Sequence, residues 1–405
     1  MELAATTEQG KRLVSLAERH ARELAERAAE HDRDGTFPFE GVESLKAAGF
    51  FAAPIPVELG GLGVASVHDL VVASSRLARG DASLAIGVNM HLVFVQNLAR
   101  RLQMARAAGN DRRAAAFAAS LEAIARDGIV MAAAISEPHQ DLSRPRTTAT
   151  RTGAGWRIEG RKLFCTMSPA ADVLYTAVAF ADDEGRDRYG YALVPTDAPG
   201  VHVHDDWDAL GMRASGSHSV TFSDADVPAS ALRGGFLVGN TIAYLERNLT
   251  AGLFHASASL GISEAAHELA VRPLAQSTNG NGGGRGRTLV AENAVDLSTL
   301  RAVIGRAAAL IDEHQAAYPA SDGPDEALTA LFAEAQAAKT FAGDAAVRIV
   351  DRALALSGGA GYMRSHPLSR AYRDARAAAF MHPLGANRAF DFLAHVTVGR
   401  EPSLT

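Results

Sequence analysis

Two changes in amino-acid composition along the 405-residue chain constrain its fold more than any single motif does. Residues 1–130 and 229–405 are rich in Ala, Leu, Glu and Arg, which favour helices. Residues 131–228 instead hold short β-branched and aromatic segments separated by Gly, Asp and Pro, which is typical of a small antiparallel β domain. Strands grouped between two helical regions predict an α+β protein with an N-terminal helical domain, a middle antiparallel β domain and a C-terminal helical bundle.

Local patterns support this division. Apolar residues between Leu13 and Ala28 recur at steps of three and four, so a first helix is expected to run to the Asp34–Gly35 pair. A Gly- and Asn-rich tract at 279–286 interrupts the second helical region. Its glycine spacing fits no phosphate-binding loop, and we expect a flexible loop between two helices there.

Composition excludes several function classes. The net charge of −6 gives no basic face for nucleic acid. The single cysteine, Cys165, cannot form an internal disulfide, and no Cys/His cluster has the spacing of a metal site. The polar start is not a secretory signal, and no apolar run reaches the roughly 18–20 residues of a membrane span. We therefore expect a cytoplasmic protein without a metal and without nucleic-acid or membrane partners.

Sequence motifs narrow the fold to a family. They are FFAAPIPVELGGLG (50–63), ISEP (135–138), GRKLFCTMSPAADVLY (160–175), WDALGMRASGSHSVTFSDADVP (207–228) and LSGGAGYMRSHPLSRAYRDAR (356–376). In this order, and over nearly the whole chain, they resemble the acyl-CoA dehydrogenases. The resemblance implies three domains, a flavin between the β domain and the C-terminal bundle, and a homo-oligomer, with a tetramer expected, whose neighbouring subunit contributes to the cofactor site.

The same motifs imply flavin contacts. A flavin ring needs hydrogen-bond donors because reduction places negative charge on it, and glycines let the backbone approach a pyrophosphate. The residues implied are Ser136, Glu137, Thr166, Ser168, Arg213, Gly358, Gly359 and Gly361. Alternatively, Thr166 and Ser168 are ordinary polar strand positions, and Arg213 only stabilises the Gly-Met-Arg turn. FAD is favoured, and FMN stays open because Ala355 replaces a family glutamine.

One departure from the family concerns the catalytic base. Many acyl-CoA dehydrogenases place a glutamate soon after the Arg-Asp-Ala sequence, whereas this chain has His382 followed by Pro383. Histidine with an ordinary pKa near 6.5 both donates and accepts protons near neutral pH. The Phe-Met-His-Pro sequence resembles the monooxygenase branch, which includes nitrososynthases (aminosugar N-oxygenases) and dibenzothiophene monooxygenase. That branch implies O2 and reduced flavin from a separate reductase.

Other candidate catalytic residues follow from the same comparison. His91, in GVNMHLVF, stands where some of these enzymes have a second active-site histidine, and Thr166 would shape the same pocket. The prediction is a monooxygenase acting on a small molecule, such as the amine of an aminosugar or of a natural-product intermediate. Two alternatives remain open. Glu246, in YLERNLTAG, could be the base of an acyl-CoA or acyl-carrier-protein dehydrogenase, or the chain could bind an acyl partner without turnover.

Overall fold

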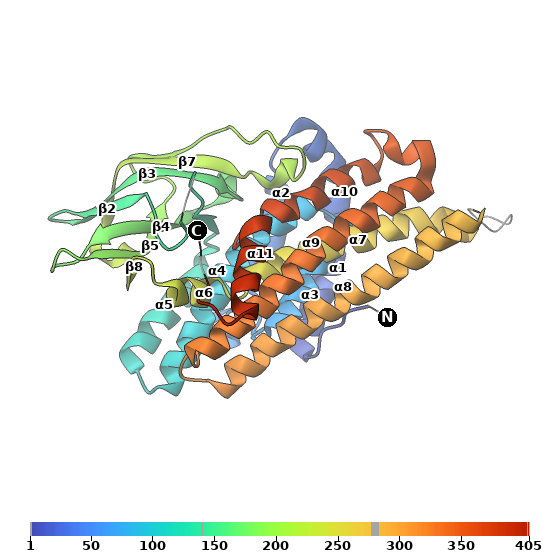
Figure 1. The fold of residues 1–405 in the computed structure, drawn as a ribbon. Helices are drawn as coiled ribbons and strands as arrows, with labels where there is room; N and C mark the ends of the chain where they lie inside the picture. Colours follow the sequence, from blue (N-terminus) through green and yellow to red (C-terminus); the bar gives the residue numbers. More distant parts are fainter. Residues whose placement is uncertain (1, 139–140, 277–282, 403, 405) are drawn as a thin grey trace.

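The computed structural model describes residues 2–138, 141–276, 283–402 and 404. Helices occupy both ends of the chain and a single sheet occupies the middle, so the predicted α–β–α order is confirmed. The sheet lies on one side of the molecule, and the long helices α7, α8 and α9 run side by side away from it (Figure 1).

The N-terminal domain contains five helices among the described residues: α1 (Glu8–Asp34), α2 (Phe39–Ala47), α3 (Val67–Ala78), α4 (Ala82–Ala107) and α5 (Asp111–Asp127). The 3₁₀ turns η1 (Phe50–Ala52) and η2 (Val57–Leu59) separate α2 from α3. Helix α1 ends where the sequence predicts, because Gly35 adopts φ 67° and its N–H donates to the carbonyl of His31.

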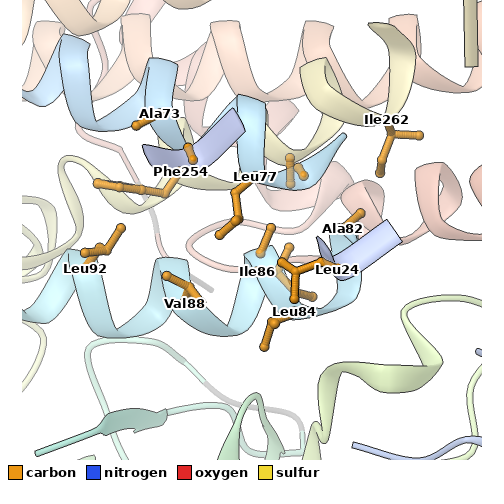
Figure 2. Close-up of a cluster of buried hydrophobic side chains, with 14 of the residues drawn as sticks. Leu24, Ala73, Leu77, Ala82, Leu84, Ile86, Val88, Leu92, Phe254 and Ile262 are labelled. Atoms are coloured by element: carbon orange, nitrogen blue, oxygen red, sulfur yellow. The ribbon is translucent and has the colours of Figure 1, made fainter. Parts of the chain in front are cut away.

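Helix α4 is the apolar centre of the molecule. Its length and hydropathy would suffice to cross a membrane, but 72% of its most apolar window is buried inside the protein. Val88 and Leu92 of α4 lie on the side of the helix that faces Leu77 of α3 and Phe254 of α7, and Leu84 lies beside Leu24 of α1 (Figure 2). Packing against these helices explains its apolarity.

The sheet contains eight strands: β1 (Met131–Ala134), β2 (Thr148–Arg151), β3 (Gly155–Cys165), β4 (Val173–Ala181), β5 (Asp187–Pro195), β6 (Val201–Val203), β7 (His218–Pro228) and β8 (Leu232–Leu237). Their order is β6-β7-β3-β2-β4-β5-β8, with β1 beside β4. Most pairs are antiparallel as predicted, but β4 runs parallel to both β1 and β2, so the sheet is mixed. The sheet also continues past residue 228, because β8 pairs with β5.

The C-terminal region forms a helical bundle of α6 (Thr241–Asn248), α7 (Ala251–Gln276), α8 (Gly283–Ala317), α9 (Asp325–Tyr362), α10 (Pro367–Arg376) and α11 (Ala386–Thr397). A 3₁₀ turn, η6 (Ala377–Phe380), follows α10, and three more, η3 (Ser168–Ala170), η4 (Arg213–Ser215) and η5 (Ala229–Ala231), lie in the β domain. Of the loop predicted at 279–286, residues 279–282 lie outside the described residues, and the remainder begins α8.

Candidate functional site

Two motifs far apart in the sequence meet where the β domain contacts the C-terminal bundle. The backbone N–H of Met212 donates to Oδ1 of Asp374 on α10 at 2.6 Å. A Cβ on Gly211 would lie 2.2 Å from the carbonyl oxygen of Arg373, so only glycine allows this approach. Burial raises the pKa of Asp374 to about 7. The Gly-Met-Arg turn is therefore docked on the Arg-Asp-Ala helix.

Arg213 makes its hydrogen bonds within the protein. Its Nε donates to the carbonyl of Asp32 at the end of α1, and its Nη1 donates to Asp208 and to the carbonyl of Ala209. Arg373 pairs with the carboxylate of the same Asp32 at 2.5 Å. These contacts are those of an arginine that stabilises the Gly-Met-Arg turn. A phosphate contact by Arg213 stays a prediction.

A chain of hydroxyl groups lies at the ends of β3 and β7. Thr166 Oγ1 lies 2.9 Å from Ser217 Oγ, which lies 2.7 Å from Ser215 Oγ. Thr166 is half-buried at the outer end of this chain, so its hydroxyl can still reach a ligand. Ser168 is buried and donates to the carbonyl of Gly216. Thr166 is thus the better placed of the two predicted flavin donors.

The surroundings of Thr166 fit a flat ring with carbonyl groups. Phe164, two residues earlier, is 61% exposed and meets Trp207 edge to face at 6.0 Å. An exposed aromatic ring beside hydroxyl donors offers both the stacking surface and the hydrogen bonds that an isoalloxazine ring requires.

Glu137 forms a buried ion pair that the sequence did not reveal. Its carboxylate lies 2.7 Å from Nζ of Lys162 on β3 and accepts from both the backbone N–H and the hydroxyl of Thr147. Burial alone would raise the pKa of Glu137, but Lys162 and the donated hydrogen bonds hold it below its usual value. The carbonyl of neighbouring Ser136 accepts from the N–H of Leu163 on β3. The pair therefore fixes this segment against β3.

The predicted glycine loop lies at the C-terminal end of α9. Gly358 kinks the helix with φ 59° and ψ −151°, and nothing lies within 4 Å of a Cβ built on Gly358 or Gly359. Gly361 is buried against Ser357. Helix α10 lies between this loop and His382 in the chain and is about 15 Å long by its ten residues. Within one chain, these glycines and the histidine are not brought together.

His382 follows η6 and lies against α6. Its Nε2 lies 2.7 Å from Oδ1 of Asn248. The Nδ2 of Asn248 donates to the carbonyl of Tyr244 at 2.8 Å, which fixes the orientation of the amide. The Nε2 of His382 must therefore carry the proton, and its Nδ1 keeps a lone pair. The Tyr244 hydroxyl donates to the carbonyl of Pro383 and holds the same segment.

The His382 ring is neutral at physiological pH. Burial, followed by the nearby Lys339 ammonium, lowers its pKa to about 3. This differs from the sequence expectation of a histidine that titrates near neutral pH, because that expectation rested on the ordinary pKa of an exposed side chain. The structure makes His382 a hydrogen-bond acceptor at Nδ1.

Lys339 supports the His382 segment, although no feature of the sequence identified this lysine. The residue is 4% exposed, and its ammonium donates to the carbonyls of Met381 and Leu384 at 2.5 and 2.6 Å. These carbonyls flank His382 and Pro383 in the sequence, so Lys339 clamps the segment that carries the histidine. Burial lowers the pKa of Lys339 to about 7. No sequence signal marks this lysine, which lies within the Ala-rich helix α9.

His91 is buried in α4 with both ring nitrogens engaged by the backbone. Nε2 lies 2.9 Å from the carbonyl of Phe51, and Nδ1 accepts from the N–H of Met131 at 3.1 Å. Burial lowers its pKa to about 4. The ring ties α4 to η1 and to β1, and it has no nitrogen left to offer a substrate.

Glu246 lies on α6 and forms an ion pair that does not involve His382. Its carboxylate pairs with Arg101 of α4, and the same guanidinium pairs with Asp322 at 3.1 Å. A small cavity of about 20 Å³ borders these three residues. His382 is not among the residues that line this cavity, so the two alternative bases do not face one pocket.

Metal binding finds no support in the described part of the chain, where no group of three His, Cys, Asp or Glu side chains comes together. His202 and His204 contact each other edge to face, and Nε2 of His204 lies 2.8 Å from the Thr221 hydroxyl. Burial raises the pKa of Cys165 to about 12, which makes its thiol unreactive.

Comparisons with known proteins agree with this architecture. Profiles of the acyl-CoA dehydrogenase N-terminal, middle and C-terminal domains match residues 7–102, 132–225 and 242–387. L-evernosamine nitrososynthase of a Micromonospora species is 34% identical over 98% of this chain and 92% of its own length. The amino sugar nitrososynthase DnmZ of Streptomyces peucetius is 32% identical over 97% and 95%.

Solved structures agree as well. KijD3 in complex with FMN and dTDP-3-amino-2,3,6-trideoxy-4-keto-3-methyl-D-glucose superposes with a TM-score of 0.89 at 32% identity, over 99% of this chain and 96% of KijD3. The matched domains, their order and the full-length relatives lead to one assignment. The chain belongs to the acyl-CoA dehydrogenase family and is a flavin-dependent oxidoreductase.

Proposed function

We propose that this protein is a monooxygenase that uses reduced flavin and O2 to oxygenate a small molecule, with the amine of an aminosugar as the substrate class. The observation that carries the proposal is the neutral imidazole of His382 where dehydrogenases of the family hold a glutamate. An aminosugar is supported by the nitrososynthases and by the amino sugar held by KijD3.

The chain's own residues have distinct tasks in this proposal. Bound reduced flavin would supply the electrons that activate O2. Thr166 would donate to the flavin ring, with Phe164 beside it. His382 would accept a hydrogen bond at Nδ1 from the neutral substrate amine, and it would take up that proton as oxygenation makes the nitrogen acidic. Asn248 and Lys339 would hold the imidazole in place.

The other assignments of the site are also proposals. Ser136, Glu137, Ser168 and Arg213 would support the cofactor through the backbone that they fix, and His91 would position α4. FAD and FMN are both candidates, since the family resemblance favours FAD and KijD3 holds FMN. Fluorescence titration with each flavin decides between them, and a protein that binds neither contradicts the proposal.

Assembly and flavin supply complete the proposal. A tetramer in which Gly358, Gly359 and Gly361 serve a neighbouring subunit's flavin is supported by apolar side chains that the single chain leaves in solvent. Tyr362 beside the glycine loop is 86% exposed, and Phe380 is 75% exposed. Light scattering measures the assembly, and a flavin-loaded monomer would contradict it. A separate reductase is expected to supply the reduced flavin.

The deciding experiment compares His382→Ala with Glu246→Gln. Reduced enzyme is mixed with O2 and a dTDP-aminosugar, and both the oxygenated product and released hydrogen peroxide are measured. We expect His382→Ala to lose roughly 10²–10⁴-fold in product formation, the usual contribution of a positioned acid–base group, and to release more peroxide.

Two outcomes would favour the alternatives. Anaerobic flavin reduction by an acyl-CoA that Glu246→Gln abolishes would make the chain a dehydrogenase. The pairing of Glu246 with Arg101, which already engages that carboxylate, argues against this. A flavin-loaded protein that consumes no O2 and is reduced by no acyl thioester would be a binding protein.

A further inference from the structure

Helices α7 and α9 pack against each other next to residues 381–384, the segment that carries His382. Gly252 and His255 lie three residues apart on α7, and Gln336 and Lys339 lie three apart on α9, so each pair shares one helix face. A Cβ on Gly252 would lie 2.9 Å from Nε2 of Gln336 and 3.6 Å from Cδ of Lys339. The two faces therefore meet, and the missing side chain at residue 252 lets Gln336 and Lys339 approach the backbone of α7 closely.

Polar atoms at this crossing lack partners. Gln336 is fully buried, and neither its Nε2 nor its Oε1 has a hydrogen-bond partner among the described residues. His255 is 6% exposed, and both of its ring nitrogens are likewise unpartnered in the described structure. Buried polar groups are nearly always hydrogen-bonded, so four such atoms beside one helix crossing indicate a small hydrogen-bonding ligand.

Lys339 contributes to the same crossing. An ammonium has three donors, and the carbonyls of Met381 and Leu384 accept two of them. Across the described ranges, no carboxylate pairs with Lys339. His255 is close enough to feel its charge, because burial first, and then Lys339 and His382, hold the pKa of His255 well below its usual value. The neutral His255 ring offers one donor and one acceptor.

We propose that an enclosed water molecule binds between Lys339, Gln336 and His255 and completes the clamp on the His382 segment. The water would accept from the third N–H of Lys339 and from Nε2 of Gln336. It would donate to Oε1 of Gln336 and to the acceptor nitrogen of His255. These four hydrogen bonds match the two to four that buried waters make in proteins.

The bound water makes Gln336 and His255 positioning residues. They would act by holding the ammonium of Lys339, which in turn holds the carbonyls on both sides of His382 and Pro383. The water site itself does not depend on the chemistry of the reaction. Only its effect on turnover rests on the proposed oxygenation.

Thermal unfolding of the full-length protein tests the site. Each single substitution, Gln336→Leu and His255→Leu, removes a partner of the water and leaves the other polar groups buried and unpaired. Both are expected to lower Tm by several degrees, and the double variant by less than the two together. If the crossing were dry, each substitution would remove an unsatisfied polar group and raise Tm, which would overturn the proposal.

A second measurement needs no variant. A high-resolution crystal structure of the unmodified protein is expected to show one ordered water within hydrogen-bond distance of Lys339, Gln336 and His255. An empty crossing would overturn the proposal even if a variant failed to fold. Neither the unfolding measurement nor the crystal structure depends on catalytic activity, so both test the water site whether or not the protein is an oxygenase.

The positioning role has its own readout. In ¹⁵N-histidine spectra, Gln336→Leu should shift the ring signals of His382, and it should lower product formation about tenfold at unchanged flavin affinity. His267→Leu is the matched control, because His267 lies on α7 with one buried unpartnered nitrogen but lines a different cavity. Unchanged His382 signals in Gln336→Leu, or equal shifts in the control, would refute the role.

Discussion

Replacing Lys339 with methionine is expected to change how the stability of the protein depends on pH. Burial lowers the pKa of this lysine from 10.5 to about 7 in the folded chain. Between these two values the unfolded chain binds a proton that the folded chain does not. The free energy of unfolding of the wild type should therefore rise with pH across this interval, by about 1.4 kcal/mol per pH unit. Lys339→Met lacks this contribution.

The magnitude is large enough to measure. Over the whole interval the lysine contributes roughly 5 kcal/mol, and between pH 7.5 and 9.5 about 2–3 kcal/mol. The methionine variant also leaves the carbonyls of Met381 and Leu384 without their donor, which costs about 1–3 kcal/mol for each. That loss does not vary with pH. The slope of the stability difference against pH therefore isolates the lowered pKa of the buried lysine.

Urea unfolding of wild type and Lys339→Met at pH 7.5, 8.5 and 9.5 measures this slope. Lys11→Met is the matched control, since Lys11 is exposed and its pKa is raised by Glu8, so its stability difference should not grow over the same range. A difference for Lys339→Met that stays constant with pH would refute the reasoning. It would show that an anion balances the ammonium in the folded protein.

Three further predictions concern the ion pairs and the site. Asn248→Asp places a carboxylate against the His382 ring and should raise the pKa of that histidine above about 3 by roughly 1–3 units in an NMR titration; an unchanged pKa would show that the contact is absent in solution. Glu137→Leu leaves Lys162 buried and unpaired and should destabilise the protein by about 3–5 kcal/mol in urea unfolding, whereas the double change with Lys162→Met should destabilise it much less. Glu246→Gln should keep product formation within a few-fold of wild type, and a loss as large as that of His382→Ala would contradict the assignment of the base.

The arrangement of domains could be predicted because it depends on local properties of the chain. Helix formers, β-branched segments and turn residues each act over a few positions, and Gly35 ends α1 by its own backbone conformation. The Gly-Met-Arg and Arg-Asp-Ala motifs were each recognisable alone. Their contact through Met212 and Asp374 needed the fold, because it joins positions 162 residues apart.

The electrostatic state of the site could not be predicted, because it depends on burial and on distant partners. His91 and His382 are both histidines next to apolar residues in the sequence. In the structure, two backbone groups occupy the first, whereas Asn248 leaves the second with a free lone pair. Lys339 lies in a regular Ala-rich helix, and only the return of the chain after η6 places two carbonyls at its ammonium. A motif can therefore identify the reacting side chain, while the groups that set its protonation and orientation come from helices whose own sequences carry no functional signature.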